Sequence, residues 1–452
     1  MNTRLYNMNA AYILLASITI ANKLIFMENF NTQMHKKEVK QNIKDFHKAV
    51  EDNVSDLKTL DILRPALPEQ QVFVQTQQYI QNNVNLYTKE KAINISLENG
   101  PYKCTYTHNG SHMLVNNKNG YISGFNTQNL QLCFESNIED SIYDTKWLHN
   151  EQYFATAQED CVFVYDKMGR ELHAVRDMKS TRMIEFLPYH FLLAGTTTSG
   201  FMNYLDTSTG EIVSSLFISD KNPSCIKASP TNGVVHLGSK NGQVSLWSPS
   251  QKSFLMKIKC HKSTVTNVEL DRSGVHMITT GNDNRIAVFD IRNTYRPMKS
   301  IGTKTSVHFS ALSQRNLLAF GFSDKIAVLK DFHNKESCVM KYKTSGIVSS
   351  LEFCSHEDIL TIGHSNGFCS IVVPGSGDPV YDTTEVSPFM SAKGRNNLEV
   401  KKLLEKIPAD MIALKSVLNQ VEKPARKIEE TKRYYETDGE SRTALSRFEK
   451  KS

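Results

Sequence analysis

The sequence predicts an all-β fold, a seven-bladed β-propeller with helical extensions at its N- and C-termini. One observation is a unit of two short apolar strands around a Gly, Asn or Asp turn, which recurs through the middle of the chain. Another is the stretch 363–382, which begins as an alternating strand and ends in a Pro-Gly turn, followed only by helix-type patterns and charge. With 452 residues, 40% of them apolar, the chain can bury the core of such a ring.

The repeated unit occurs seven times, and the ends of the first five units lie 40, 40, 42 and 42 residues apart. A period of about 40–45 residues with four short strands per unit is typical of WD-repeat propellers. The clearest copies are GSKNGQVSLWS and GNDNRIAVFD, with Trp247 and Phe289 in the tryptophan position. The central strand pairs of the seven units span residues 113–125, 154–166, 192–206, 234–247, 277–290, 317–329 and 359–373.

The seventh unit has no outer strand after its third strand. A turn interrupts the chain there, formed by Pro374, Gly375, Ser376 and Gly377. The strand pattern 93–97 precedes the first unit and has no partner of its own, so we expect it to complete the seventh blade. Closing the ring removes exposed sheet edges, which favour aggregation. The propeller is therefore predicted over residues 93–373, closed by strand 93–97.

One blade carries a predicted polar network. His261, Thr279 and Asp283 occupy the positions at which WD repeats connect a histidine, a hydroxyl and a carboxylate by hydrogen bonds. A histidine and an aspartate also suggest catalysis, but no nucleophile accompanies them. We therefore interpret the three residues as a structural network within the blade.

The first 27 residues are an apolar segment, of which 10–21 resembles the core of a signal peptide. This stretch is too short to span a bilayer. A translation start at Met27 or Met34 instead of Met1 would leave it out of the protein.

An N-terminal arm is predicted over residues 28–92. Its first part is charged and helical up to about residue 68, and 69–90 is expected to be extended because it is rich in Gln and Asn. The helix docks either on its own domain or on a partner. Its apolar positions recur at spacings of three and four, at Val39, Ile43, Phe46, Val50, Val54, Leu57 and Leu60.

The C-terminal part divides into a helical segment over 374–424 and a charged, flexible tail over 425–452. Two apolar helical stripes are predicted, first Val400, Leu403, Leu404 and Ile407, then Met411, Leu414, Leu418 and Val421. From Ser391 onwards there are 15 Lys and Arg against 10 Asp and Glu. These charges either form a solvated face or contact RNA or protein. The candidate contact residues are Lys393, Arg395, Lys401, Lys402, Arg426, Lys427, Lys432 and Arg433.

No motif for catalysis, metal binding or cofactor binding accompanies the repeats. The eight cysteines have no C-x-x-C spacing, so we expect free thiols in a reducing compartment and no zinc site. A phosphate-binding loop, H-E-x-x-H and G-x-S-x-G are absent from the sequence. We therefore expect no enzyme, no cofactor and no small-molecule substrate. A net charge of +6 permits a nucleic-acid partner without predicting one.

Five stretches resemble one known family. They are KWLHNEQYFATAQ (146–158), EFLPYHFLLAG (185–195), GFMNYLDTSTGEIV (200–213), VVHLGSKNGQVSLWSP (234–249), and GHSNGFCSIVVPGSGDPVYD with LEVKKLLEKIPADMIAL (398–414). All resemble the WD-repeat propeller subunit of the eukaryotic small-subunit processome, the family of U-three small-nucleolar-RNA-associated protein seven. Its C-terminal module is the BING-type domain. The resemblance covers the chain from about Leu67 to Leu414 and is most specific around VPGSG and LLEKIP.

The resemblance implies a non-catalytic scaffold in the nucleolus of the nucleus, needed for pre-18S rRNA processing and 40S ribosomal subunit biogenesis. The implied partners are processome proteins, including other WD-repeat subunits, with pre-18S rRNA and the box C/D guide snoRNP contacted directly or indirectly, and no membrane. Of the basic stretch that family members carry before the helix, only Lys393 and Arg395 remain, which favours protein docking over direct RNA binding. A generic WD-repeat adaptor of another complex is the alternative, although it does not explain VPGSG and LLEKIP. A secreted or membrane-tethered propeller rests only on 10–21.

Overall fold

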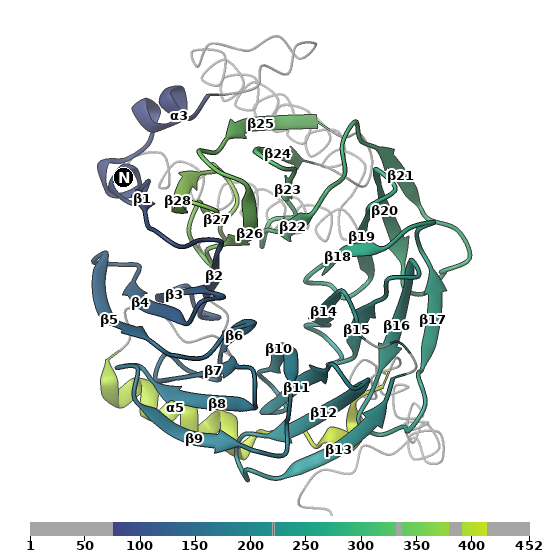
Figure 1. The fold of residues 1–452 in the computed structure, drawn as a ribbon. Coiled ribbons are helices and arrows are strands. Elements are labelled where there is room, and N and C mark those ends of the chain that lie inside the picture. Colours follow the sequence, from purple (N-terminus) through teal and green to yellow (C-terminus); the bar gives the residue numbers. More distant parts are fainter. Residues whose placement is uncertain (1–75, 219, 221, 331–336, 379–390, 414–452) are drawn as a thin grey trace, which may run out of the picture. The chain divides into compact units, whose positions relative to one another are not determined.

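The computed structural model describes residues 76–378, except 219, 221 and 331–336, and residues 391–413. All of them belong to one compact unit, Val74–Ser452. Seven four-stranded antiparallel sheets follow one another around a ring (Figure 1), which confirms the predicted seven-bladed propeller. No helix in the described part of the chain is long and apolar enough to cross a membrane.

Each blade has an inner strand beside the centre of the ring, and the inner strands of neighbouring blades contact one another. In blades 1 to 3 the strands, from inner to outer, are β2 (Tyr102–Tyr106), β3 (His112–Asn117), β4 (Tyr121–Asn126), β5 (Gln131–Asn137); β6 (Asp144–Trp147), β7 (Tyr153–Ala157), β8 (Val162–Asp166), β9 (Glu171–Val175); and β10 (Thr181–Leu187), β11 (Leu192–Thr197), β12 (Phe201–Asp206), β13 (Ile212–Phe217).

The remaining blades repeat this arrangement. Their strands are β14 (Cys225–Ala228), β15 (Val235–Gly238), β16 (Gln243–Trp247), β17 (Met256–Lys259) in blade 4; β18 (Val265–Leu270), β19 (His276–Gly281), β20 (Arg285–Asp290), β21 (Lys299–Gly302) in blade 5; β22 (Phe309–Leu312), β23 (Leu318–Gly321), β24 (Lys325–Lys330), β25 (Ser337–Lys343) in blade 6; and β26 (Val348–Phe353), β27 (Ile359–His364), β28 (Gly367–Val372) with β1 (Asn94–Ser96) in blade 7.

The outer strand of blade 7 comes from the N-terminal side of the chain. Strand β1 pairs antiparallel with β28, with Ile95 opposite Phe368. The ladder extends past β1 at both ends, because Ser370 N–H donates to the Ile93 carbonyl at 2.8 Å and Leu97 N–H donates to the Asn366 carbonyl at 3.0 Å. The ring is thus joined by a strand that precedes blade 1 in sequence.

Two short helices precede β1, so the expectation of an extended segment is wrong over these residues. Helix α3 spans Gln77–Asn83 and α4 spans Leu86–Glu90. Ile80 is 3% exposed within the core of blades 6 and 7, and Val84, one helical turn later, packs against the same core. The burial of these two side chains outweighs the weak helix preference of the Gln- and Asn-rich sequence. The helix predicted before residue 68 lies outside the described residues.

Helix α3 also covers the end of β28. The amide Nε2 of Gln77 donates to the Val372 carbonyl at 2.7 Å, and its Oε1 accepts from the Val372 N–H at 3.2 Å. One side chain therefore satisfies both backbone groups that β1, which is only three residues long, leaves unpaired at this edge.

The residues of the predicted polar network lie together in blade 5. The Nδ1 atom of His261 lies 3.0 Å from the Asp283 carboxylate, and its Nε2 atom lies 3.0 Å from the Thr279 hydroxyl. His261 is 3% exposed. A Cβ atom at Gly281 would lie 2.6 Å from the imidazole, so glycine is required where the ring crosses the backbone.

Replacing Thr279 with valine should destabilise the propeller by about 1–3 kcal/mol, because the isosteric methyl group leaves the buried Nε2 atom of His261 without a partner. Urea titration of the variant measures this loss as a lower midpoint at an unchanged slope. Thr209→Val, at an exposed threonine, is the matched control and should change stability by less than about 0.5 kcal/mol. Equal midpoints for the two variants would mean that the network contributes nothing to stability.

The eight cysteines are free thiols, and five of them are buried. Burial raises the pKa of Cys225 to about 12 and that of Cys369 to about 12. Such thiols remain protonated and behave as small apolar core residues.

Candidate interaction site at the channel mouth

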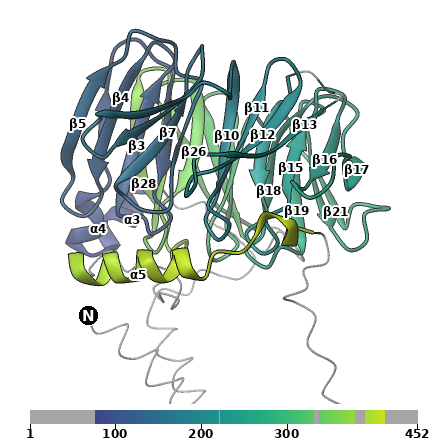
Figure 2. The ribbon, with the colours of Figure 1, turned by 90° about the horizontal axis from the view of Figure 1, so that it is seen from below.

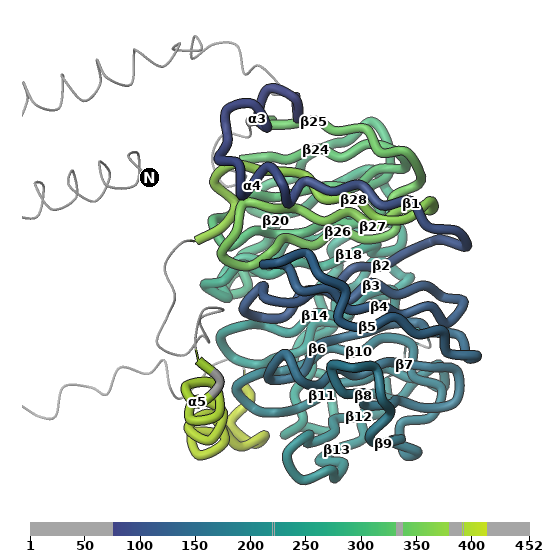
Figure 3. The backbone as a smooth tube through the Cα atoms, turned by 90° about the vertical axis from the view of Figure 1, so that its left-hand side faces the viewer, coloured from purple at the N-terminus to yellow at the C-terminus, as the bar shows by residue number. Residues whose placement is uncertain are grey.

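A segment after blade 7 runs back across one face of the ring. We call residues 391–413 the C-terminal strap. It consists of helix α5 (Ala392–Leu404) and the 3₁₀ turn η1 (Ala409–Met411). The helix begins at Ser391, whose Oγ accepts from the Gly394 N–H at 3.3 Å, an N-cap bond. Figures 2 and 3 show α5 lying along the ends of the strands.

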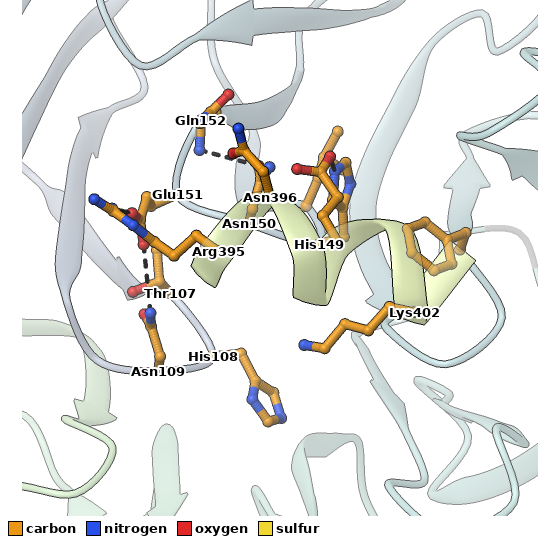
Figure 4. A pocket seen from close by; sticks show the side chains of 13 residues that line it. Thr107, His108, Asn109, His149, Asn150, Glu151, Gln152, Arg395, Asn396 and Lys402 are labelled. Atoms are coloured by element: carbon orange, nitrogen blue, oxygen red, sulfur yellow. Dashed lines mark hydrogen bonds and ion pairs between the residues drawn. The ribbon is translucent and has the colours of Figure 1, made fainter. Parts of the chain in front are cut away.

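The helical half of the strap is attached through charged side chains. The Arg395 guanidinium donates to the carboxylate of Glu151, which is 8% exposed in the turn between β6 and β7. Figure 4 shows Arg395 pointing towards Glu151. One turn further along α5, a carboxylate oxygen of Glu399 lies 2.8 Å from Nε2 of His149. The helix is thus fixed to blade 2 by two polar pairs on one of its faces.

The LLEKIP stretch is attached to blade 3. The Lys406 ammonium donates to the Asp206 carboxylate and, at 2.8 Å, to the Ser208 hydroxyl. Burial acts to raise the pKa of Asp206, but Lys406 and the hydrogen bonds from Ser208 outweigh it, so the pKa is lowered. The Ile407 N–H donates to the Tyr189 carbonyl at 3.1 Å. The carbonyl of Ile407 lies 3.1 Å from Nδ1 of His190, so this backbone is held on both sides.

The end of the strap is anchored in the core of blade 4. Ile412 is 0% exposed and belongs to the hydrophobic cluster that runs from blade 3 to blade 5. Its carbonyl accepts from the Ser248 hydroxyl at 2.5 Å and from the Ser250 hydroxyl at 3.3 Å. The end of the strap is therefore held by the buried Ile412 side chain, which we call the apolar plug, and by the hydrogen bonds of its carbonyl.

The apolar stripe predicted on α5 faces outwards. Val400 is 57% exposed, Leu403 42% and Leu404 83%, whereas Ile407 is partly buried. Met411 is 50% exposed in η1. The rest of the second predicted stripe, beyond residue 413, lies outside the described residues.

The predicted contact residues occupy different environments. Arg395 is bound to Glu151, and Lys401 lies 3.8 Å from Glu405 one helical turn away. Lys393 is exposed, and Lys402 is partly buried beside the cavity described below. The other four lie outside the described residues: Arg426, Lys427, Lys432 and Arg433.

The predicted signature turn closes the end of blade 7. Gly375 has a φ of +82°, which favours glycine, and Ser376 is 1% exposed. The N–H of Gly377 donates to the Asp358 carboxylate at 2.9 Å. A Cβ atom at Gly377 would lie 2.6 Å from the Glu357 backbone nitrogen, so the backbones of these two turns can approach only through glycine. Pro374 follows the third strand and ends the sheet.

A ring of charged residues, missed in the sequence, lines the channel beside the strap. The register between the inner strand and the second strand of each blade identifies one equivalent position per blade. These positions are Thr105, Lys146, Glu185, Lys227, Glu269, Ala311 and Glu352. Successive positions are 39 to 42 residues apart, which is the period of the repeat. That period was the signal that could have revealed the ring.

Two ion pairs join neighbouring blades within this ring. Lys146 Nζ lies 3.0 Å from the Glu185 carboxylate, and Lys227 Nζ lies 3.2 Å from the Glu269 carboxylate. The negative charge of Glu269 raises the pKa of Lys227, which therefore stays charged at neutral pH. Both lysines are thus neutralised by a glutamate at contact distance.

A depression covers this ring at the mouth of the channel. Two adjoining cavities of about 430 and 490 Å³ form it and share residues of blades 1, 3, 4 and 7 and of the strap. Strap residues Leu398, Lys401 and Lys402 form one wall. The shared residues are His108, Glu185, Phe186, Pro188, Tyr189, Lys227, Ser355 and Ile407. The propeller and the strap therefore build this surface together.

Glu352 at the floor should decrease the stability of the protein at neutral pH. Burial raises the pKa of Glu352 above its ordinary value of 4.5, and the opposing effects of Lys146, Lys227 and the Tyr106 N–H are smaller. The folded protein therefore holds this proton more tightly than the unfolded chain. The protein therefore loses stability as the pH rises from the pKa of Glu352 in the unfolded chain to its raised pKa in the folded protein. The loss is complete above the folded pKa.

Replacing Glu352 with glutamine should remove this penalty. We expect E352Q to match the wild type at about pH 4 and to melt at a higher temperature than the wild type at about pH 8. Melting curves across this range measure the difference. E211Q, at an exposed glutamate, should show no such pH trend. A difference that shrinks with rising pH would contradict the raised pKa.

The charged groups at the mouth are paired largely with one another or with the strap. Among the described residues no group of three or more His, Cys, Asp or Glu side chains is placed to hold a metal ion. The lysines are neutralised by glutamates, and two of the histidines at the mouth, His149 and His190, bond the strap. The arrangement offers a surface of mixed charge and apolar area over a closed ring.

Comparison with known proteins places the chain in a family. The BING4CT (NUC141) domain matches residues 338–415, and the Nucleolar protein 10-like, N-terminal domain matches residues 103–316. U3 small nucleolar RNA-associated protein 7 of Saccharomyces cerevisiae is 33% identical over 420 residues, 86% of this chain and 75% of that protein. The chain belongs to the family of U3 small nucleolar RNA-associated protein 7.

Animal members of this family are longer than the chain. WD repeat-containing protein 46 of Mus musculus is 38% identical over 337 residues, 73% of this chain and 54% of that protein. The protein of the same name from Caenorhabditis elegans is 35% identical and is covered to 62%. The chain thus spans about half the length of the mouse relative. The crystal structure of the Myceliophteria thermophila Cps50 (Swd1) β-propeller domain shares the fold, with a TM-score of 0.53, 13% identity, and 61% of this chain and 98% of that one covered.

The stretches that resemble the U3 small nucleolar RNA-associated protein 7 family meet in the strap interface. The segment 398–414 contributes Glu399, Lys406 and Ile412. The other four stretches contribute the residues that hold the strap: His149 and Glu151, Tyr189 and His190, Asp206 and Ser208, and Ser248. Segments far apart in the sequence therefore carry one shared feature, a strap and its binding surface.

Proposed function

We propose that the protein is a non-catalytic scaffold of the small-subunit processome, acting in pre-18S rRNA processing and 40S ribosomal subunit biogenesis in the nucleolus. The similarity to U3 small nucleolar RNA-associated protein 7 over 86% of the chain supports the proposal that the protein belongs to this particle. The observation that carries the scaffold role is the strap, whose charged, backbone and apolar contacts fix it across blades 2, 3 and 4.

The geometry of the strap suits a docking platform. Its polar face is bound to the propeller, while Val400, Leu403 and Leu404 are directed away from it. A helix fixed on a closed ring presents these side chains in one orientation, so a partner loses little conformational freedom of the protein when it binds. We propose that the strap and the channel mouth are contact surfaces for other processome proteins, including WD-repeat subunits.

Contact with pre-18S rRNA and the box C/D guide snoRNP is proposed to be mainly indirect. Arg395 is engaged with Glu151, and Lys401 lies near Glu405, so two of the four candidate contact residues in the described part of the chain already have acidic neighbours. Lys393 and Lys402 remain proposed contacts for phosphate or acidic side chains, as do the four basic residues from Arg426 to Arg433.

The test is purification of the tagged full chain from its own cells, followed by sequencing of the bound RNA. We expect enrichment of pre-18S RNA and guide snoRNA, and nucleolar fluorescence of a tagged copy. A variant with the strap released, Ile412→Asp, should fold but lose part of the associated proteins. Recovery of another complex without pre-18S RNA would favour a generic WD-repeat adaptor and contradict the proposal.

A further inference from the structure

The channel ring contains a carboxylate that no cation of the described residues contacts. At the level of Glu352 the neighbouring blades contribute Thr105 and Ala311, which carry no charge. The two lysines of the ring are each in contact with another glutamate, at 3.0 and 3.2 Å. Within the described part of the chain Glu352 forms no ion pair, and its carboxylate accepts from the Tyr106 N–H.

The space in front of this carboxylate has the size and lining of a peptide site. The cavity that Glu352 lines holds about 430 Å³ and lies within the range of ligand sites in proteins. Aromatic and apolar side chains such as Phe186, Tyr189 and Leu398 line the same cavity. Trp147, which also lines this cavity, is 6% exposed and packs its ring against Phe154 in the core of blades 1 and 2.

The charges at the floor favour a peptide over a nucleic acid. A phosphate chain entering the mouth would meet the carboxylates of Glu185, Glu269 and Glu352. The lysines opposite them are already neutralised at contact distance. On the strap wall Lys401 lies 3.8 Å from Glu405. Within the ring two lysines face three glutamates, so an added ammonium or guanidinium group is the charge that the ring lacks, while the walls above it also carry Lys402 and Arg272.

We infer that the channel mouth binds an extended peptide of another protein and seats one of its lysine or arginine side chains beside Glu352. The aliphatic stem of that side chain would lie against Tyr106 and Phe186, which line the same cavity, and its charged head would reach the carboxylate. This inference does not depend on the proposed function, because it follows from the charges and the cavity alone.

The test uses the purified full chain and fluorescein-labelled nonapeptide mixtures. The central residue of each mixture is fixed as lysine, arginine, norleucine or glutamate, and the flanking positions hold uncharged residues. Fluorescence anisotropy should show that the lysine and arginine mixtures bind about tenfold more tightly than the norleucine mixture, and that the glutamate mixture binds most weakly. In E352Q this preference for a basic residue should disappear, whereas E211Q should keep it.

Melting curves establish that both variants are folded, and glutamine retains an oxygen that can accept from the Tyr106 N–H. Equal affinity for the lysine and norleucine mixtures would overturn the inference, and so would a preference that survives in E352Q. A single-stranded oligouridine RNA that competes with the peptides and binds E352Q as tightly as the wild type would assign the mouth to nucleic acid instead.

Discussion

Replacing Ile412 with aspartate should detach the strap while the propeller stays folded. Ile412 is fully buried, and removing an isoleucine side chain from a core costs about 2–5 kcal/mol, to which a buried carboxylate adds. If about 3 kcal/mol of this cost lowers the free energy of opening the strap, the open state becomes more than about 100-fold more populated. Hydrogen exchange measured by mass spectrometry should therefore accelerate by that factor over residues 391–413, and little over β11 and β19.

The control for this variant lies at the neighbouring position. Met411 is 50% exposed, so Met411→Asp should leave the exchange of the strap nearly unchanged. Both variants retain the side chains that make the polar contacts of the strap. If the strap of Ile412→Asp stays as protected as that of the wild type, the ion pairs of Arg395 and Lys406 hold it without the buried Ile412 side chain.

The orientation of α5 explains why its docking was not predictable from the apolar pattern. An apolar stripe normally indicates the face of a helix that packs on its own domain. Here the packed face carries Arg395 and Glu399, and the stripe that includes Leu404 is exposed. The binding partners of Arg395 and Glu399 are Glu151 and His149 of blade 2, far away in the sequence, and no local spacing records such pairing. The family resemblance marked the right segments without indicating their contacts.

The blades themselves were predictable because their signal is repeated. A strand of four to six residues is weak evidence of structure alone, yet seven copies at one period support one another. The charged ring shows the limit of the same argument. A single lysine or glutamate in a short strand, such as Lys146 or Glu352, suggests a solvent-facing position. Only the alignment of the repeats places such residues at one level of the channel.

The short helices α3 and α4 show a second limit. Their sequence is polar, and the helices are too short to be stable alone in water. Helix α3 forms because Ile80 enters the core of blades 6 and 7 and Gln77 pairs with the backbone of Val372. Tertiary contacts of this kind determine the local structure, whereas the local sequence alone favoured an extended segment.

Replacing Ile95 with proline should open the ring at blade 7. The bonds of Ile93 and Leu97 to β28 mean that, by the alternation of an antiparallel ladder, the N–H of Ile95 also faces β28. Proline removes this donor and leaves a carbonyl of β28 unpaired, at a cost of about 1–3 kcal/mol, before the loss of packing around Phe368 is counted. We expect the melting temperature to fall by about 6 °C or more.

The matched variant is Ser96→Pro, because the N–H of Ser96 points away from β28 in the same ladder. It should melt within about 2 °C of the wild type. Opening β28 also exposes a row of unpaired backbone groups on an apolar strand, so Ile95→Pro should form concentration-dependent aggregates in size-exclusion chromatography. If both variants behave alike, pairing at β1 does not close the ring. The closure would then rest on α3, whose Gln77 holds the far end of the same strand, and Gln77→Leu would be the variant that lowers stability.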